Sequence, residues 1–285
     1  MFSYIKAILF ALLGGVSSVL PLSATFNISF LNGLLGGSSG ETHLYLSMVM
    51  FGAASAILLA FYRQMYDVLF SGSEKLMRKA EYGVNVPMFT FKDVLIGCAP
   101  LILLFFPIGK GVFLFNVSDL ILDKKAALAE GVGLIASGVV YFAAINKSIK
   151  TKKHKKFSKL SMGVAGAAQL CSAILPGASH TALTFSTSVM FRHRKNKAVT
   201  YSYLLAFPAL VCAGFLHIIL GTVADAVVPV PALIVTYIVS AFSAAFGILV
   251  FSAMAGEKKS RVFSYVNIAL GLLSIILFAV RLFIK

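Results

Sequence analysis

The sequence predicts an all-α polytopic membrane protein, and three observations support this fold class. Hydrophobic residues account for 59% of the 285 residues and charged residues for 12%, whereas a soluble globular protein carries about 25% charged residues. The mean hydropathy is +0.92. The 25 Lys and Arg residues lie mainly in short stretches between apolar runs, which is the pattern that orients a membrane protein, so no nucleic-acid partner is expected.

Six apolar runs are predicted to cross the membrane, a distance that takes about 20 helical residues. They are residues 43–66, 93–115, 127–146, 200–221, 231–254 and 263–283. Positive charge marks the cytoplasmic side. When the basic loops are placed there, successive runs cross the membrane in alternating directions, as a continuous chain requires. These loops are residues 63–92, 147–159, 192–197 and 257–261. Both termini of this multi-pass chain are then expected on the outer face.

The apolar run between Lys159 and Arg192 contains a Pro-Gly break followed by a Ser-His-Thr cluster. Basic clusters flank the run on both sides, so both of its ends are expected in the cytoplasm. A single crossing would put the ends on opposite sides, and two crossings would need twice the available length. The run is therefore predicted to form a re-entrant hairpin. Protein or a water-filled cavity must surround the irregular backbone of its turn.

The first forty residues are predicted to form a second re-entrant hairpin, which enters from the outer face. They are apolar but broken at Pro21, and they are too short to cross twice. The sequence around Pro21 resembles that around Pro176, 155 residues later; chance similarity of two Leu-Pro segments is the alternative explanation.

These elements predict a single integral membrane domain, residues 1–285, which consists of two inverted halves. The halves are residues 1–146 and 160–285, and the basic loop 147–159 joins them. Each half is a re-entrant hairpin followed by three spans, and because three is odd the second half is upside down. Inverted repeats with broken helices place a binding site where the halves meet, near the middle of the membrane.

The two predicted turns carry hydroxyl and amide side chains but almost no charge. Broken helices also present unpaired N–H groups and the positive ends of helix dipoles, which suit a phosphate or a carboxylate. His180 is the only titratable side chain among these groups, and a histidine hydrogen-bonded inside the bundle is the alternative. The polar side chains at the turns are Ser17, Ser18, Ser23, Thr25, Asn27, Ser179, His180 and Thr181.

Metal-dependent catalysis is not expected from this sequence. The acidic residues, Glu41 and Glu130 among them, fall at span ends or in loops, so no carboxylate is predicted in the membrane to hold a divalent ion. The same pattern argues against a proton- or sodium-coupled transporter. Cys98, Cys171 and Cys212 lie far apart in apolar sequence, without disulfide or metal spacing. No cofactor is expected, apart from a divalent cation brought in with a diphosphate ligand.

At the two turns the chain resembles the undecaprenyl-diphosphate phosphatase family, the bacitracin-resistance phosphatases of the bacterial envelope. Residues 14–25 (GGVSSVLPLSAT) are similar to the first motif of that family, residues 175–181 (LPGASHT) to its second, and residues 201–208 (YSYLLAFP) to the helix that follows. The resemblance covers nearly the whole chain. It implies six spans, two re-entrant hairpins in an inverted repeat, a pocket open to the outer face and a polyprenyl diphosphate or phosphate ligand.

The chain departs from the family at most of the charged positions of these motifs. Gly14 and Ser18 stand where the family has two glutamates. The other departures are Ala24 for a serine, Asn27 for a histidine, Leu46 and Met50 for an acid and an amide, His180 for an arginine and Thr181 for a serine. Losing one such proton-transfer or electrostatic group typically slows an enzyme about 10²- to 10⁴-fold, so weak or lost phosphatase activity is expected.

The resemblance implies a protein of the bacterial plasma membrane that handles a carrier lipid for peptidoglycan synthesis. The expected ligand-binding residues are Ser18, Ser23, Thr25, Asn27, Gly177, Ser179, His180 and Thr181, with His180 and Ser179 as the catalytic candidates. A polyprenyl-phosphate flippase and a non-catalytic envelope partner are the alternative functions. Anionic membrane lipid is an expected partner of the basic loops, and a homodimer is compatible with the sequence.

Overall fold

The computed structural model describes residues 2–70, 89–109, 112–223 and 228–284, and these residues form an all-α membrane fold. Within these ranges, five helices are long and apolar enough to cross a membrane. They are α3 (Ser39–Ala60), α7 (Val117–Lys150), α10 (Lys195–Val223), α11 (Val230–Met254) and α12 (Arg261–Ile284). The predicted class, an all-α polytopic membrane protein, is confirmed.

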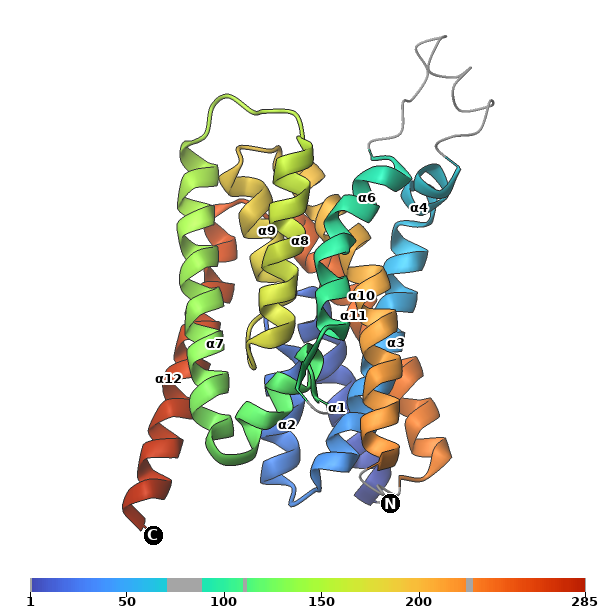
Figure 1. Ribbon diagram of the computed structural model, residues 1–285, viewed down its shortest axis with the longest axis vertical. Coiled ribbons are helices and arrows are strands. Elements are labelled where there is room, and N and C mark those ends of the chain that lie inside the picture. The colour runs from blue at the N-terminus through green and yellow to red at the C-terminus, as the bar shows by residue number, and fades with distance from the viewer. Residues whose placement is uncertain (1, 71–88, 110–111, 224–227, 285) are drawn as a thin grey trace.

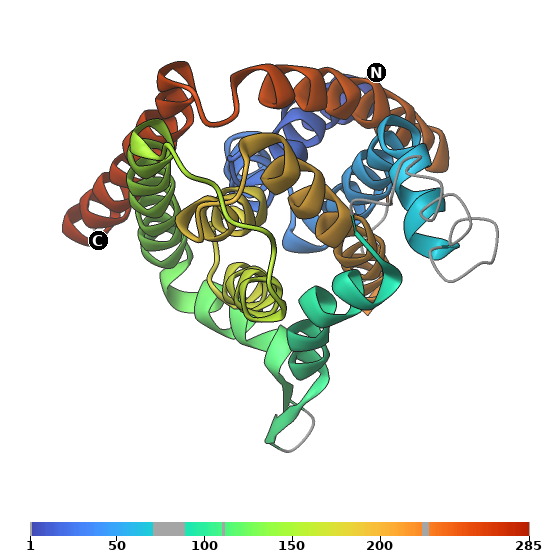
Figure 2. The same cartoon turned by 90° about the horizontal axis from the view of Figure 1, so that it is seen from above.

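Two helical hairpins occupy the segments that the sequence predicts to be re-entrant. The first consists of α1 (Phe2–Val19) and α2 (Ala24–Leu34), and the second of α8 (Lys159–Ile174) and α9 (His180–Met190). They enter from opposite ends of the molecule, so that their closed ends point toward its middle (Figure 1). Seen from above, they lie among the long helices, with α7 and α12 on one side and α3 on the other (Figure 2).

The two hairpins correspond closely in length and in the spacing of their boundaries. Helix α1 ends at Val19 and α8 at Ile174, 155 residues later. Helices α2 and α9 each contain 11 residues. The next helices, α3 and α10, begin at Ser39 and Lys195, which are 156 residues apart. The spacing between equivalent boundaries therefore changes by one residue, which is explained by one extra residue in the second turn.

The segment predicted to be a span at 93–115 is shorter and less regular than expected. Helix α4 (Tyr62–Leu69) precedes it, and α6 (Phe91–Cys98) then tightens into the 3₁₀ helix η1 (Ala99–Phe105). An antiparallel pair follows, β1 (Pro107–Gly109) with β2 (Val112–Phe113), and then η2 (Leu114–Asn116).

Two prolines explain this irregular segment. Pro100 lies in the first turn of η1, where a missing N–H is tolerated. The residue before a proline is pushed out of the helical region, and Phe106, which precedes Pro107, has an extended backbone with ψ of 127°. The second apolar run therefore cannot continue as one straight helix.

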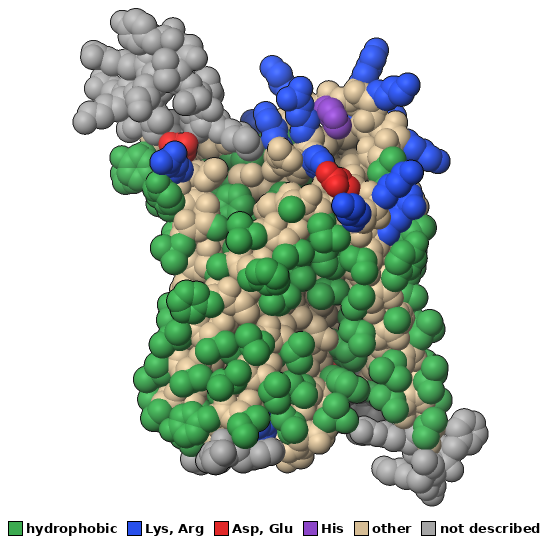
Figure 3. Space-filling view, turned by 180° about the vertical axis from the view of Figure 1, so that it is seen from behind, with side chains coloured by type: hydrophobic (Ala, Val, Ile, Leu, Met, Phe, Trp, Pro, Cys, Tyr) green, Lys and Arg blue, Asp and Glu red, His purple; other side chains and the backbone are tan. Residues whose placement is uncertain are grey.

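The surface divides into an apolar band and a basic end. Large side chains on α11 face outward, including Phe242 at 74% exposure and Leu249 at 70%, which suits a bilayer and would be unfavourable in water. Figure 3 shows Lys and Arg side chains gathered at one end, beyond this band. Both described ends of the chain lie at the opposite end (Figure 1).

A clamp at the basic end joins the loop after α7 to the short loop between α9 and α10. The ring of His193 stacks on Phe157 with centroids 3.7 Å apart, and its Nδ1–H donates to the carbonyl of Lys155 at 3.1 Å. The carbonyl accepts only, so Nδ1 must carry the proton. A main-chain bond from Lys155 N–H to the Arg192 carbonyl completes the clamp.

Burial lowers the pKa of His193 below its usual 6.5, which makes the clamp sensitive to acid. The unfolded chain takes up the proton first as the pH falls, so the stability of the folded state is intact above about pH 6.5 and declines below it. We expect the melting temperature in detergent to fall more between pH 7.5 and pH 5 for the wild type than for His193→Phe, which keeps the stacked ring. Parallel pH profiles for the two proteins would contradict this prediction.

Candidate binding site at the hairpin turns

The first turn, between α1 and α2, is built by a proline and a capping serine. Pro21 has no N–H to donate and ends the helical pattern. Ser23 caps α2, and its hydroxyl accepts from the N–H of Phe26 at 3.3 Å. The hydroxyl of Ser23 also lies 3.1 Å from that of Thr25. Two of the predicted binding residues are thus adjacent at the start of one helix.

Side chains from two distant helices satisfy the carbonyl groups that this break leaves open. The hydroxyl of Tyr203 on α10 donates to the Val19 carbonyl at 3.0 Å. The amide of Asn267 on α12 donates to the Pro21 carbonyl at 2.7 Å. A broken helix is tolerated at membrane depth only where its backbone groups find partners in the protein, and these two bonds meet that requirement.

The second turn, between α8 and α9, packs directly against the backbone of α7. Gly177 has φ of +77°, a conformation that favours glycine. A Cβ atom on Gly177 would lie 2.2 Å from the carbonyl oxygen of Glu130, and one on Gly133 would lie 2.0 Å from that of Pro176. Ser179 then caps α9 by accepting from the N–H of Ala182 at 3.2 Å. The glycines on both sides permit this close contact.

The other polar residues of the first turn bond mainly to their own hairpin. Asn27 donates from its amide to the hydroxyl of Ser17 at 2.6 Å. Ser18 is buried and donates to the carbonyl of Gly14 at 2.8 Å. These bonds leave Asn27 partly accessible and tie Ser18 to the inside of α1. Ser18 is therefore less available to a ligand than the sequence alone predicts.

His180 and Thr181 bring buried, unsatisfied polar atoms to the start of α9. His180 Nε2 and Thr181 Oγ1 are both buried and have no hydrogen-bond partner among the described residues. Buried polar atoms are normally satisfied, so this pair is suited to a ligand or a water molecule. The first turn of a helix is also where backbone N–H groups lack intrahelical partners and attract anions.

Glu130 is a buried carboxylate that the sequence reasoning placed at the edge of a span. It lies on α7 and is 7% exposed, and the hydroxyl of Ser29 on α2 lies close enough to interact with its carboxylate. Ser29 is one helical turn beyond Thr25, so the two share a face of α2. Since the backbone of Glu130 also touches Gly177, this residue contacts both hairpins.

The sequence predicts Glu130 near the start of a span that begins at residue 127. Helix α7 begins ten residues earlier, at Val117, so Glu130 lies inside the helix and not near its end. The charged stretch before residue 127 is typical of a linker in sequence, whereas in the structure it belongs to the helix. Glu130, Gly133 and Ser137 recur at helical spacing on one face of α7, and all three are buried. This spacing is the sequence signal that indicates a buried position for Glu130.

Within the described residues, no group of three or more His, Cys, Asp or Glu side chains could hold a metal ion.

Two proline-broken hairpins that enter a helical bundle from opposite ends define a class of polytopic membrane proteins with a polar site inside the bundle. The sequence matches the family described as bacitracin resistance protein BacA over residues 7–273. The chain belongs to this family, which confirms the resemblance noted in the sequence.

Proteins named undecaprenyl-diphosphatase are similar to this chain along almost their whole length. The one from Prochlorococcus marinus (strain MIT 9515) is 24% identical over 277 residues, which cover 96% of this chain and 98% of the relative. Undecaprenyl-diphosphatase 2 from Clostridium acetobutylicum is 25% identical over 300 residues, which cover 95% of each chain.

The first hairpin packs against apolar side chains around Gly14. A Cβ atom on Gly14 would lie 2.6 Å from Cδ1 of Ile28 and 2.9 Å from Cγ1 of Val49. Leu46 and Met50 are buried in the hydrophobic core. The surroundings of Gly14, Leu46 and Met50 are therefore apolar and closely packed.

Proposed function

We propose that this protein binds a polyprenyl diphosphate at the two hairpin turns. The observation that carries the proposal is the pair of proline-broken hairpins in a chain of the BacA family. In each hairpin the second helix begins after a capping serine, Ser23 for α2 and Ser179 for α9. Hydroxyls and helix N-termini suit the phosphate groups of such a ligand. The residues proposed to hold it are Ser23, Thr25, Asn27, Gly177, Ser179, His180 and Thr181, and Ser18 would join them only by giving up its bond to the Gly14 carbonyl.

We propose further that hydrolysis of the diphosphate is weak or lost. The family glutamates are replaced by Gly14 and Ser18, and the latter is bonded within its own helix. His180 stands where the second motif of the family has an arginine, so the fixed positive charge is absent there, and its Nε2 has no hydrogen-bond partner in the described structure. Glu130 is a buried carboxylate whose backbone contacts Gly177 of the second turn, and it is our candidate to exchange protons with His180 in any residual reaction. A divalent cation would take part only if the diphosphate brings it to the site.

The same architecture supports a second candidate, a flippase for polyprenyl phosphate. The equal lengths of α2 and α9, and their entry from opposite ends, fit two inverted halves, residues 1–146 and 160–285, that expose one site alternately to each side of the membrane. This function needs no acid–base pair.

A non-catalytic envelope partner is the third candidate function. For the first two functions we propose the bacterial plasma membrane as the location, with both termini on the outer face.

The test is a phosphate-release assay on the purified full-length protein with a polyprenyl diphosphate, alongside the Prochlorococcus marinus relative. We expect saturable binding, with turnover at least about 100-fold below that of the relative, because several proton-transfer and electrostatic groups are missing. His180→Ala should weaken binding and abolish any residual turnover. His154→Ala, which changes a histidine in the exposed basic loop, is the matched control.

Three outcomes separate the candidate functions. Turnover equal to that of the relative would contradict the loss of catalysis. Binding that His180→Ala leaves unchanged would contradict the site. Transfer of a labelled polyprenyl phosphate across vesicles, without phosphate release, would favour the flippase.

A further inference from the structure

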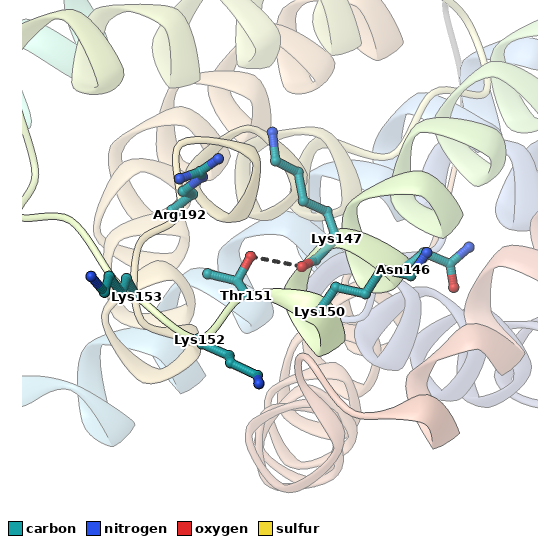
Figure 4. Close-up of a pocket in the computed structure, with 7 residues that line it drawn as sticks. All are labelled: Asn146, Lys147, Lys150, Thr151, Lys152, Lys153 and Arg192. Atoms are coloured by element: carbon teal, nitrogen blue, oxygen red, sulfur yellow. Dashed lines mark hydrogen bonds between the residues drawn. The ribbon is translucent and has the colours of Figure 1, made fainter.

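A basic cavity of about 500 Å³ lies at the end of the molecule opposite to the termini. It is formed by the last turns of α7, the loop that follows them and the loop between α9 and α10 (Figure 4). Its volume falls within the usual range for ligand sites, about 300 to 1,000 Å³. The lining residues are Asn146, Lys147, Lys150, Thr151, Lys152, Lys153 and Arg192.

The lining of this cavity carries five positive charges and no carboxylate. Like charges around one cavity repel one another, and salt screens this repulsion only partly for charges closer than the Debye length, about 8 Å at physiological ionic strength. Arg261 adds a sixth cation beside the cavity, where its guanidinium donates to Oδ1 of Asn146. An anion with more than one negative charge would relieve this repulsion.

The backbone around the cavity is held in place without any ligand. The hydroxyl of Thr151 donates to the carbonyl of Lys147 at 2.7 Å, as Figure 4 shows. Lys155 N–H donates to the Arg192 carbonyl at 2.9 Å, and the stacked ring of His193 fixes the same loop. Arg192 has φ of +65°, a conformation that few non-glycine residues adopt. The charged side chains therefore project from a pre-arranged frame, which reduces the entropy lost on binding.

The position of the cavity favours a lipid over a soluble ion. Its lining includes the last residues of α7, whose candidate membrane span runs from Ala127 to Lys150, so the cavity lies at the end of a membrane span. Ile149, which precedes the lining residue Lys150 in α7, is 39% exposed, and Leu160 at the start of α8 is 69% exposed. A lipid could place its phosphate among the lysines and its chains along these side chains, whereas a free phosphate would leave the apolar surface unused.

We propose that this cavity binds the headgroup of an anionic phospholipid that carries at least two negative charges. The site is separate from the hairpin turns, and it does not depend on the function proposed for them. It gives the protein a lipid-phosphate contact at the end where the basic loops lie.

The experiment measures cardiolipin binding to the full-length protein in neutral detergent by native mass spectrometry, with sodium diphosphate titrated in parallel. In the test variant Lys152→Gln and Lys153→Gln are combined. In the matched control Lys258→Gln and Lys259→Gln remove the same charge from exposed positions between α11 and α12, outside the cavity. At about 1 kcal/mol per lysine, the cavity variant should bind cardiolipin about 30-fold more weakly, and the control should stay within about twofold of the wild type.

Melting temperatures of both variants establish that they are folded. Equal weakening in the two variants would overturn the proposal, because the attraction would then be a property of the whole basic surface. Diphosphate that binds as tightly as cardiolipin, with the same loss in the cavity variant, would assign the cavity to a soluble phosphate and overturn the lipid assignment.

Discussion

Gly177→Ala is expected to lower the free energy of unfolding by about 2 to 5 kcal/mol. A left-handed backbone costs an alanine about 1 to 2 kcal/mol, and Gly177 has φ of +77°. Overpacking adds about 1 to 3 kcal/mol, because the new Cβ atom would lie 2.2 Å from the Glu130 carbonyl oxygen. Chemical or thermal unfolding in a fixed detergent measures the change.

Gly163→Ala is the matched control for this prediction. Gly163 lies inside α8 of the same hairpin, and a Cβ atom there would meet nothing within 4 Å. Alanine stabilises a helix interior by about 0.8 to 1 kcal/mol relative to glycine, so this variant should be slightly more stable than the wild type. If the two variants shifted stability equally, the close contact between the second turn and α7 would be wrong.

His180→Arg is expected to tighten binding of a polyprenyl diphosphate about 10- to 100-fold at pH 8. A neutral histidine is then replaced by a permanent cation with several donors. A hydrogen bond to a charged group contributes about 1.5 to 3 kcal/mol. The position at the start of α9 adds the positive end of the helix dipole. Equilibrium binding in detergent, with a labelled ligand, measures the affinity.

His180→Gln is the control, since it keeps a polar side chain at this position without adding charge. It should bind as the wild type does at pH 8, where the wild-type histidine is neutral. If His180→Arg bound no more tightly than His180→Gln, the start of α9 would not contact the phosphate groups.

Much of the fold could be predicted from charge and length alone. Basic flanks on both sides of the run around Pro176 predict a hairpin there, and helices α8 and α9 occupy that run. The second span could not be predicted, because the apolar run at 93–115 contains two prolines whose effect depends on the surrounding packing. Composition measures how apolar a segment is, and it does not show where the segment bends.

The candidate site could be predicted at its turns but not in its surroundings. Ser23 and Ser179 are helix caps, as serines after a proline break suggest. The contacts of Asn267 with Pro21 and of Glu130 with Ser29 join residues more than a hundred positions apart. No local pattern encodes such pairs, since they arise only when the helices pack.

The bond between Asn267 and Pro21 has a consequence for biogenesis. The first hairpin enters the bilayer when it leaves the ribosome, but the partner of its turn belongs to α12 and is made 246 residues after Pro21. Until that helix inserts, the nascent protein holds an unpaired carbonyl group in a hydrocarbon environment, which is costly. A truncated chain that ends before α12 would therefore expose this defect, and membrane proteases would degrade it faster than the complete protein.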